Sequence, residues 1–348
     1  MKKITALLLS LSLLAALFTA CTQPQATESQ SPAPDASESA APETGTPGSD
    51  EPQAEGVDLT ILYEADDDMI NNYSLLAVNP DAPFVDADGN PVSDVYINTE
   101  GASALINWML SEEGKTAASE YGYADYGEYL FYLTEGGPVS TAEIPQATEE
   151  TKTIRMSTTT SVNDSGLLGY LLPLFEEAYG YSVEVTSAGT GKAIANAQSG
   201  NADLLLVHSK SQEEDFVAAG YSYVLPGFDS ERLTFMYNYF VLCGPSADPA
   251  GVKDAASVKD AFAAIAEGKY PFVSRGDQSG THTKEISLWP EELGITADAA
   301  SVEGYTDWYT YSNAGMGVCL TMAEEMGAYI LSDKATFLTF QANNGVME

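Results

Sequence analysis

Short apolar runs alternate with longer amphipathic runs along most of the second half of this chain. Runs with the length and composition of strands lie at 153–156, 181–186, 203–207, 237–243 and 271–274. Runs with helical spacing lie at 167–179, 192–198, 211–219, 258–267, 281–289 and 318–326. This alternation predicts an α/β fold whose parallel strands present ligand sites at their carboxyl ends.

The start of the chain has a different pattern. Two lysines precede a mostly apolar run over 4–18, and small residues then lead to Cys21. This layout is typical of a secretory signal, and the run is too short for a comfortable membrane span. The residues before Cys21 resemble a bacterial lipoprotein signal, which implies a signal peptide over 1–20 and a lipid on Cys21. The alternative is ordinary secretion after cleavage near Ala20.

The next segment, 21–56, has nothing to bury. After Cys21 it contains six prolines and seven acidic residues, with no basic and no large apolar residue. We expect a disordered tether that holds the folded part away from the membrane. The protein is therefore expected to be exported and anchored to the outer face of the cell membrane.

The charge of the chain excludes one class of partner. With 51 acidic against 14 basic residues, the formal net charge is −37, so nucleic-acid binding is not expected. An anion would have to bind against this field. Its affinity would then come from short-range, desolvated donors, because salt screens the long-range field.

The segment from Ser274 to His282 is rich in hydrogen-bond donors. Arg275, one of three arginines in the chain, ends a predicted strand, and the hydroxyls of Ser279 and Thr281 stand at the start of the next helix. An arginine, two hydroxyls and the free N–H groups of a helix start suit a ligand with negative charge on several oxygens. Only Asp277 nearby is an acceptor.

Two earlier strand-to-helix turns have the same character. Five hydroxyl residues follow one another at 157–161, and glycines flank a threonine in the turn at 187–191. Glycines let backbone N–H groups approach a ligand closely. We expect the three turns to converge on one small anion. The predicted ligand-binding residues are Thr159, Thr160, Ser161, Gly189, Thr190, Gly191, Arg275, Ser279, Gly280 and Thr281.

Several motifs follow one another in the order of a known family. They are Ser-Thr-Thr-Thr-Ser at 157–161, Asn-Asp-Ser-Gly-Leu-Leu at 163–168, Gly-Thr-Gly at 189–191, 203–208, Asn-Tyr-Phe-Val at 238–241, 274–285 and Gly-Met-Gly at 315–317. Together they resemble the tungstate-binding protein family. The resemblance implies a two-lobed, periplasmic-binding-protein-like (type II) fold that delivers an oxyanion to a membrane ABC permease. Tungstate is the first expectation for the ligand, with molybdate, phosphate or an anion-sensing role as alternatives.

The chain order departs from this family. The stretches 59–64, 72–80 and 104–114 resemble the family's C-terminal third, although they precede the other motifs here. We therefore expect a circular permutation. The predicted parts are 57–75 with 240–348 as lobe 2, 76–135 with 153–239 as lobe 1, and 136–152 as the connection between the family's original ends.

Other readings of single residues have less support. Arg155 and Arg232 are expected to make structural ion pairs, and the aromatic group at 305–311 to pack at the lobe interface. Pairing of Cys243 with Cys319 is left open. A hydrolase using Ser161 or Ser279 would need a nearby base, and neither serine lies in a Gly-x-Ser-x-Gly turn. We expect no enzyme activity, no metal and no cofactor in this chain, and a monomeric protein.

Overall fold

A mixed β-sheet runs through residues 58–343 and 345, which are the residues that the computed structural model describes. The predicted signal peptide, the tether and Cys21 lie outside these residues. The strands of the large sheet are β1 (Leu59–Tyr63), β2 (Ile70–Ala77), β3 (Tyr132–Leu133), β4 (Thr153–Thr159), β5 (Ser182–Ala188), β6 (Leu204–Val207), β7 (Leu233–Pro245) and β10 (Ile330–Asp333). Their order is β1-β7-β2-β6-β4-β5, and β3 and β10 also pair with β7. A second sheet holds β8 (Phe272–Ser274) and β9 (Tyr309–Tyr311).

The predicted parallel arrangement is correct for only part of the sheet. Strand β4 is parallel to both β5 and β6, and β8 is parallel to β9. Strand β7, however, is antiparallel to β1, β2, β3 and β10, and β2 is antiparallel to β6. The parallel strands predicted from the alternation are therefore confirmed for β4, β5 and β6. Strand β7 is antiparallel because its partners come from distant parts of the sequence rather than from adjacent βα units.

The predicted helices are present, with ends that shift by one or two residues. The α-helices are α1 (Thr99–Met109), α2 (Glu112–Glu120), α3 (Tyr123–Tyr126), α4 (Thr160–Asp164), α5 (Leu167–Tyr179), α6 (Thr190–Gln198), α7 (Lys210–Ala218), α8 (Val258–Gly268), α9 (Gly280–Leu288), α10 (Met316–Met326) and α11 (Lys334–Ala342). Short 3-10 helices are η1 (Asp67–Met69), η2 (Val252–Asp254), η3 (Glu291–Leu293) and η4 (Ala299–Tyr305). Over the described residues, no helix combines the length and the apolar character needed to cross a membrane.

Strand β6 shows how lobe 1 is built. Its side chains alternate between two cores: Leu204 and Leu206 join the cluster with α1 and α5, whereas Leu205 and Val207 join the cluster with α6 and α7. All four residues are buried, as expected for a strand covered by helices on both faces. We call this part, with strands β4–β6 at its centre, lobe 1.

Lobe 2 is built on the same principle around β1, β10 and the end of β7. Phe240 and Leu242 face a cluster with α8, and Val241 and Cys243 face a cluster with α10 and α11. The aromatic group at 305–311 packs into or against the first of these cores, where Trp289 contacts Trp308 edge-on at 5.4 Å. It lies in the core of lobe 2, so its predicted place at the lobe interface was wrong.

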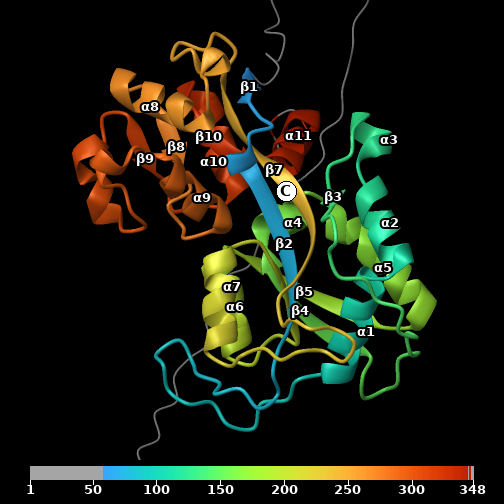
Figure 1. Cartoon of the computed structure of the whole chain (residues 1–348). Helices are drawn as coiled ribbons and strands as arrows, with labels where there is room; N and C mark the ends of the chain where they lie inside the picture. Colours follow the sequence, from blue (N-terminus) through green and yellow to red (C-terminus); the bar gives the residue numbers. More distant parts are fainter. Residues whose placement is uncertain (1–57, 344, 346–348) are drawn as a thin grey trace, which may run out of the picture. The chain divides into compact units, whose positions relative to one another are not determined.

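Strands β2 and β7 connect the two lobes. Along β7, Phe235 and Met236 belong to a core of lobe 1, and Phe240 and Leu242 belong to a core of lobe 2. Figure 1 shows the two strands side by side between the orange and red elements and the green elements, in agreement with their pairing from Ile70 to Leu75. A long strand shared by two cores can serve as a hinge.

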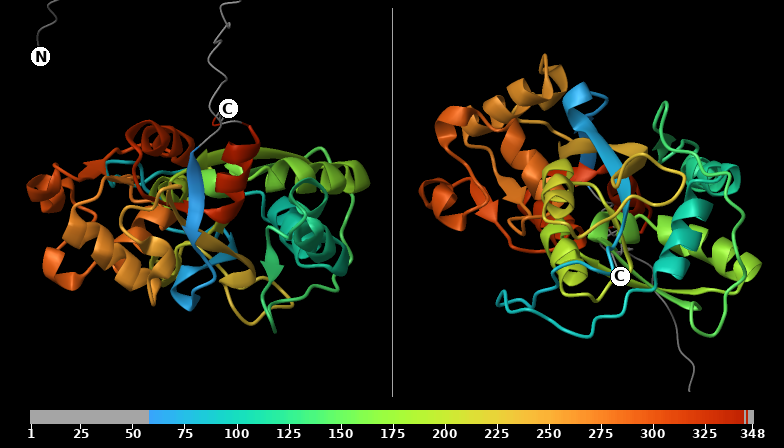
Figure 2. Two further views of the ribbon diagram at one scale, coloured as in Figure 1. Left: turned by 90° about the horizontal axis from the view of Figure 1, so that it is seen from above. Right: turned by 60° about the horizontal axis from the view of Figure 1, so that its bottom comes forward.

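The beginning and the end of the described chain lie together in lobe 2. The Gln341 side chain donates a hydrogen bond to the Leu59 carbonyl at 3.0 Å, and Leu59 shares a core with Phe337 and Phe340. The left view in Figure 2 shows the first strand, in blue, beside the last helix, in red. The strand at 59–63 and the helix at 336–341 therefore contribute to one core. Residues 58–133 form no separate domain, since β2 lies between β6 and β7.

Candidate functional site

Each of the three predicted turns joins the carboxyl end of a strand to the start of a helix. Thr159 precedes α4, Gly189 precedes α6 and Ser279 precedes α9. The Ser279 hydroxyl accepts a hydrogen bond from the His282 N–H at 3.2 Å, as an N-cap residue does. The local structure at all three turns is therefore the one predicted, a strand end followed by a helix start.

The turn of lobe 2 contacts both turns of lobe 1. Arg275 Nη2 donates to Thr160 Oγ1 at 3.1 Å, and the Gly280 N–H donates to Thr190 Oγ1 at 3.2 Å. Gly189 lies so close to Asp277 that a β-carbon on it would stand 3.3 Å from Oδ2. These contacts bring the ten predicted site residues into one region between the lobes. Gly191 lies in the first turn of α6, beside Thr190.

Most of the site is buried, and one donor in it lacks a partner. Thr159, Ser161, Thr190, Arg275, Ser279 and Thr281 are all at most 3% exposed. Among the described residues, Thr281 Oγ1 finds no hydrogen-bond partner. A buried hydroxyl without a partner is unfavourable. The hydroxyl of Thr281 is thus available to a bound molecule.

Asp277 faces protein donors. Its Oδ2 lies 2.6 Å from Arg275 Nη2, and its Oδ1 accepts from the Ser279 N–H at 3.1 Å. A second carboxylate, Asp164, lies nearby: burial raises its pKa, and Arg275 acts in the opposite direction. Arg275 is therefore the cation of the site, although a carboxylate partly neutralises it.

The run of five hydroxyls divides into two groups. Ser157 donates to the Ala193 carbonyl at 3.0 Å, and Thr158 donates to the Leu206 carbonyl at 2.7 Å. These two hydroxyls therefore stabilise the packing within lobe 1. The second group faces the site: the hydroxyl oxygens of Thr159 and Ser161 lie 3.2 Å apart, and Thr160 lies between these two residues in the chain.

His208 belongs to the site, although the sequence analysis did not select it. Its Nε2 lies 2.9 Å from Ser161 Oγ, and its Nδ1 lies 2.8 Å from Asn71 Oδ1. A β-carbon on Gly280 would stand only 2.5 Å from His208 Cε1, so this close approach depends on a glycine. Its position directly after the buried strand β6 was the available signal, because ligand sites lie at strand carboxyl ends.

A serine, a histidine and an asparagine in this order resemble a catalytic triad. Burial, together with Arg275, lowers the pKa of His208 to about 3. A general base with so low a pKa is poorly matched to neutral pH. Ser279, the other serine considered for a hydrolase, caps α9. The His282 ring accepts a hydrogen bond from the Gln278 N–H and does not bond to the Ser279 hydroxyl. The geometry favours binding over hydrolysis.

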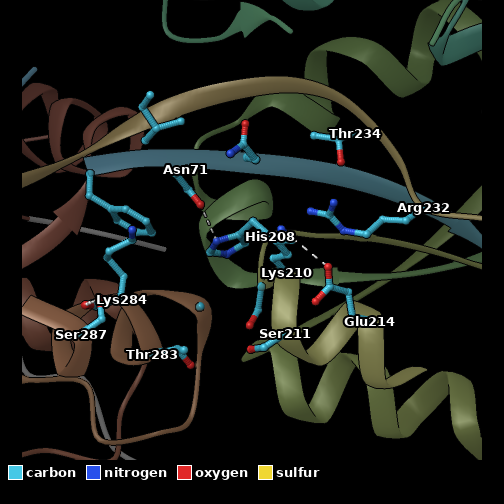
Figure 3. Close-up of a pocket in the computed structure, with 15 residues that line it drawn as sticks. Asn71, His208, Lys210, Ser211, Glu214, Arg232, Thr234, Thr283, Lys284 and Ser287 are labelled. Carbon is cyan, nitrogen blue, oxygen red and sulfur yellow. Dashed lines mark hydrogen bonds and ion pairs between the residues drawn. The ribbon is translucent and has the colours of Figure 1, made fainter. Parts of the chain in front are cut away.

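Behind His208 lies a buried polar network. Asp333 Oδ2 accepts hydrogen bonds from Tyr73 at 2.7 Å, from Asn238 at 2.6 Å and from Asn71 at 3.2 Å. Its members come from β2, β7 and β10, so the network ties the hinge strands to the site. On the other side of His208, a cavity of about 680 Å³ opens between α7 and α9 (Figure 3).

The remaining predictions concern residues away from the anion site. Arg155 pairs with the buried Asp203 at 2.5 Å, and Arg232 pairs with Glu213, so both arginines have the structural role predicted. Cys243 and Cys319 are buried and are not joined by a disulfide. Within residues 58–343 and 345, no three His, Cys, Asp or Glu side chains are grouped as metal ligands would be.

Comparison with known proteins finds relatives over part of the chain. The tungstate-binding protein TupA of Peptoclostridium acidaminophilum is 44% identical over 203 residues, which are 58% of this chain and 66% of that protein. TupA of Campylobacter jejuni is 35% identical over 183 residues, 53% of this chain and 62% of that protein. The chain thus spans just under two thirds of the length of these relatives.

One solved structure matches a similar share of the chain. The tungstate ABC transporter protein of Geobacter sulfurreducens is 39% identical, with a TM-score of 0.46, over 56% of this chain and 77% of that one. The sequence profile of the PBP superfamily domain matches residues 145–347, which is more than half of the chain. This region contains all three donor-rich turns. The chain therefore belongs to the PBP superfamily.

Proposed function

We propose that this protein is the solute-binding protein of an ABC importer and that it binds a tetrahedral oxyanion, with tungstate as the first candidate. The observation that carries the proposal is the convergence of buried donors from three turns: Arg275, the free hydroxyl of Thr281 and the N-termini of α6 and α9. The matched relatives named as tungstate-binding proteins support it. The site binds its ligand without transforming it.

The state of Asp277 favours tungstate over phosphate. Tungstate is a dianion without a proton at neutral pH, whereas monohydrogen phosphate carries a proton that needs an acceptor. Both Asp277 oxygens already accept from Arg275 and from the Ser279 N–H. A site in which the Asp277 carboxylate already accepts hydrogen bonds from protein donors matches tungstate, a ligand that only accepts hydrogen bonds. Molybdate, which has the same charge and shape, is the nearest alternative.

Titration calorimetry of the purified protein with tungstate, molybdate, sulfate and phosphate tests this function. Tungstate should bind, molybdate should compete with it, and the smaller sulfate and the protonated phosphate should not displace either. Tight phosphate binding that disappears in the Asp277→Asn variant would show that Asp277 accepts a ligand proton, and tungstate would then not be the ligand.

The anchor and the partner are part of the proposal. A lipid on Cys21 would hold the protein on the outer face of the membrane, beside an ABC permease that receives the anion. Incorporation of labelled fatty acid that is lost in Cys21→Ser tests the anchor. Uptake of tungstate by cells lacking this protein separates an importer from an anion sensor, because only an importer is needed for uptake.

We also propose that the chain is a circular permutation. The profile match starts at 145 and the relatives are longer than the matched part, yet β1 and β2 from outside the match occupy the same sheet. Segments 57–75 with 240–348 would form lobe 2, 76–135 with 153–239 lobe 1, and 136–152 the connection. The contact between Leu59 and Gln341 supports this arrangement, because a short linker could join those ends.

Restoring the usual order tests the permutation. A protein opened within 136–152, with 348 linked to 57, should fold and bind the anion with similar affinity, because the same surfaces are buried. A control opened inside β2 breaks the sheet and should not fold. Failure of the first protein to fold would refute the permutation without affecting the binding proposal.

A further inference from the structure

The orientation of the Asn71 side chain is fixed by its surroundings. Its Nδ2 lies 2.8 Å from Tyr73 Oη, 2.9 Å from Asn238 Oδ1 and 3.2 Å from Asp333 Oδ2. These atoms accept hydrogen bonds, so the NH₂ group belongs on this side. The Asn71 carbonyl oxygen therefore faces His208 Nδ1 at 2.8 Å. Because that oxygen can only accept, Nδ1 must carry a proton.

The proton on Nδ1 determines what Ser161 can do. In neutral His208 the other nitrogen, Nε2, has a lone pair and lies 2.9 Å from Ser161 Oγ. The hydroxyl of Ser161 then donates to Nε2. A hydroxyl has only one proton. Ser161 consequently presents lone pairs rather than a donor to the anion site while His208 is neutral, which is unfavourable beside a dianion.

We propose that His208 is a positioning residue whose uptake of a proton accompanies anion binding and turns the Ser161 hydroxyl toward the anion. With protons on both ring nitrogens, His208 donates to Asn71 through Nδ1 and to Ser161 through Nε2. The Ser161 proton is then free to reach a ligand oxygen. The Nε2–H bond is the only covalent bond that His208 gains, and its proton comes from solvent. This inference rests on the proposed binding of an oxyanion.

The charges around His208 fit this coupling. Arg275 opposes protonation in the free protein, in addition to burial. A bound dianion would offset Arg275 and favour the imidazolium form. Figure 3 shows His208 against the cavity between the lobes, with its contact to Asn71. The other charged groups of the cavity and the network are Lys210 and Glu214 of α7, Arg232 before β7, Lys284 of α9 and, beyond Asn71, Asp333.

Linkage turns this geometry into a measurable effect. If a proton on His208 strengthens anion binding by some factor, the anion raises the proton affinity of His208 by the same factor. Between the pKa of His208 in the free protein and its pKa in the complex, Kd should fall up to about tenfold for each pH unit of acidification. The pKa in the complex sets the upper end of this window.

Calorimetry with tungstate tests the coupling in the intact protein. Titrations at one pH, in two buffers with different ionisation enthalpies, give the number of protons taken up on binding. We expect net uptake that approaches one proton as the pH falls from about 8 to about 6, with Kd falling at least about threefold over this range. Tungstate binding without proton uptake would overturn the inference and leave the proposed function intact.

Variants assign the proton. His208→Gln should bind tungstate without proton uptake and with a Kd that no longer depends on pH, since an amide does not titrate in this range. The other histidine of the chain, His282, provides the matched control: His282→Gln should keep the uptake. Loss of uptake only in His282→Gln would overturn the assignment. If His208→Gln does not fold, the titrations of the wild-type protein in two buffers still test the inference. If the wild-type protein binds none of the anions, both the proposed function and this inference are refuted.

Discussion

Replacing Arg275 with alanine should weaken tungstate binding more than any other single substitution at the site. The Arg275 side chain is buried, and its Nη2 lies 3.1 Å from Thr160 Oγ1 and 2.6 Å from Asp277 Oδ2. Loss of one partner from a buried, hydrogen-bonded charge pair costs about 2–5 kcal/mol. This free energy corresponds to an increase in Kd of about 30-fold to several thousand-fold.

The structure favours the upper part of this range. In Arg275→Ala the Asp277 carboxylate, whose side chain is 11% exposed, loses its cation and remains beside the anion. Like charges in a desolvated site repel each other strongly. The double variant Arg275→Ala/Asp277→Asn should therefore bind tungstate about tenfold more tightly than Arg275→Ala alone. The second substitution removes the repulsion between Asp277 and the anion, although it does not restore the attraction that Arg275 supplied.

Calorimetry of the two variants, beside a matched charge control, measures both effects. Lys253→Gln removes one positive charge from an exposed position of lobe 2 and should leave Kd unchanged. Thermal unfolding of each variant checks that the fold is retained. A Kd for Arg275→Ala within about tenfold of the wild type, which is about 1.4 kcal/mol, would refute the assignment of Arg275 to the ligand.

Three further substitutions test the surroundings of the site. Burial raises the pKa of Glu285 to about 7 from 4.5, so wild-type stability should fall by on the order of 3 kcal/mol as the pH rises from 4.5 to 7, and denaturant unfolding of Glu285→Gln should lack this loss. Gly280→Ala places a β-carbon 2.5 Å from His208 Cε1, so calorimetry should show weaker anion binding, and thermal unfolding should show a lower melting temperature because the site is overpacked. Asp203→Asn removes the carboxylate charge that pairs with the partly exposed Arg155 and should lower the free energy of unfolding by about 1–3 kcal/mol in denaturant titrations, whereas an unchanged midpoint would contradict the structural role of this pair.

The sequence was informative where local rules decide the structure. The hydrophobic run at 167–179 predicted α5 with the bounds observed. The hydroxyl- and glycine-rich turns predicted three helix starts, because their backbone N–H groups lack partners within the helix. Arg275 and the hydroxyls of Ser279 and Thr281 at one of these helix starts predicted a donor-rich site. All of these inferences depend on residues within about a dozen positions of one another.

Pairing between distant segments was beyond such reasoning. The four-residue strand β10 gave no pattern of its own, and it exists because β7 offers it an antiparallel partner. Strand β7 itself extends over 13 residues, about twice the predicted run, because it contributes to the cores of both lobes. The antiparallel pairs of β7 were not predicted for this reason: strand direction is set by which strands pair.

The sequence alone determined the three donor-rich turns and the residues that form them, because short-range backbone chemistry specifies a strand end followed by a helix start. Only the tertiary structure joined His208 to Ser161 across 47 positions and Asn71 to Asp333 across 262 positions. It also directed Asp277 toward Arg275 and the Ser279 N–H. The two long-range contacts depend on which distant segments pack together, and the free energy of that packing comes from non-local burial, which no local pattern encodes.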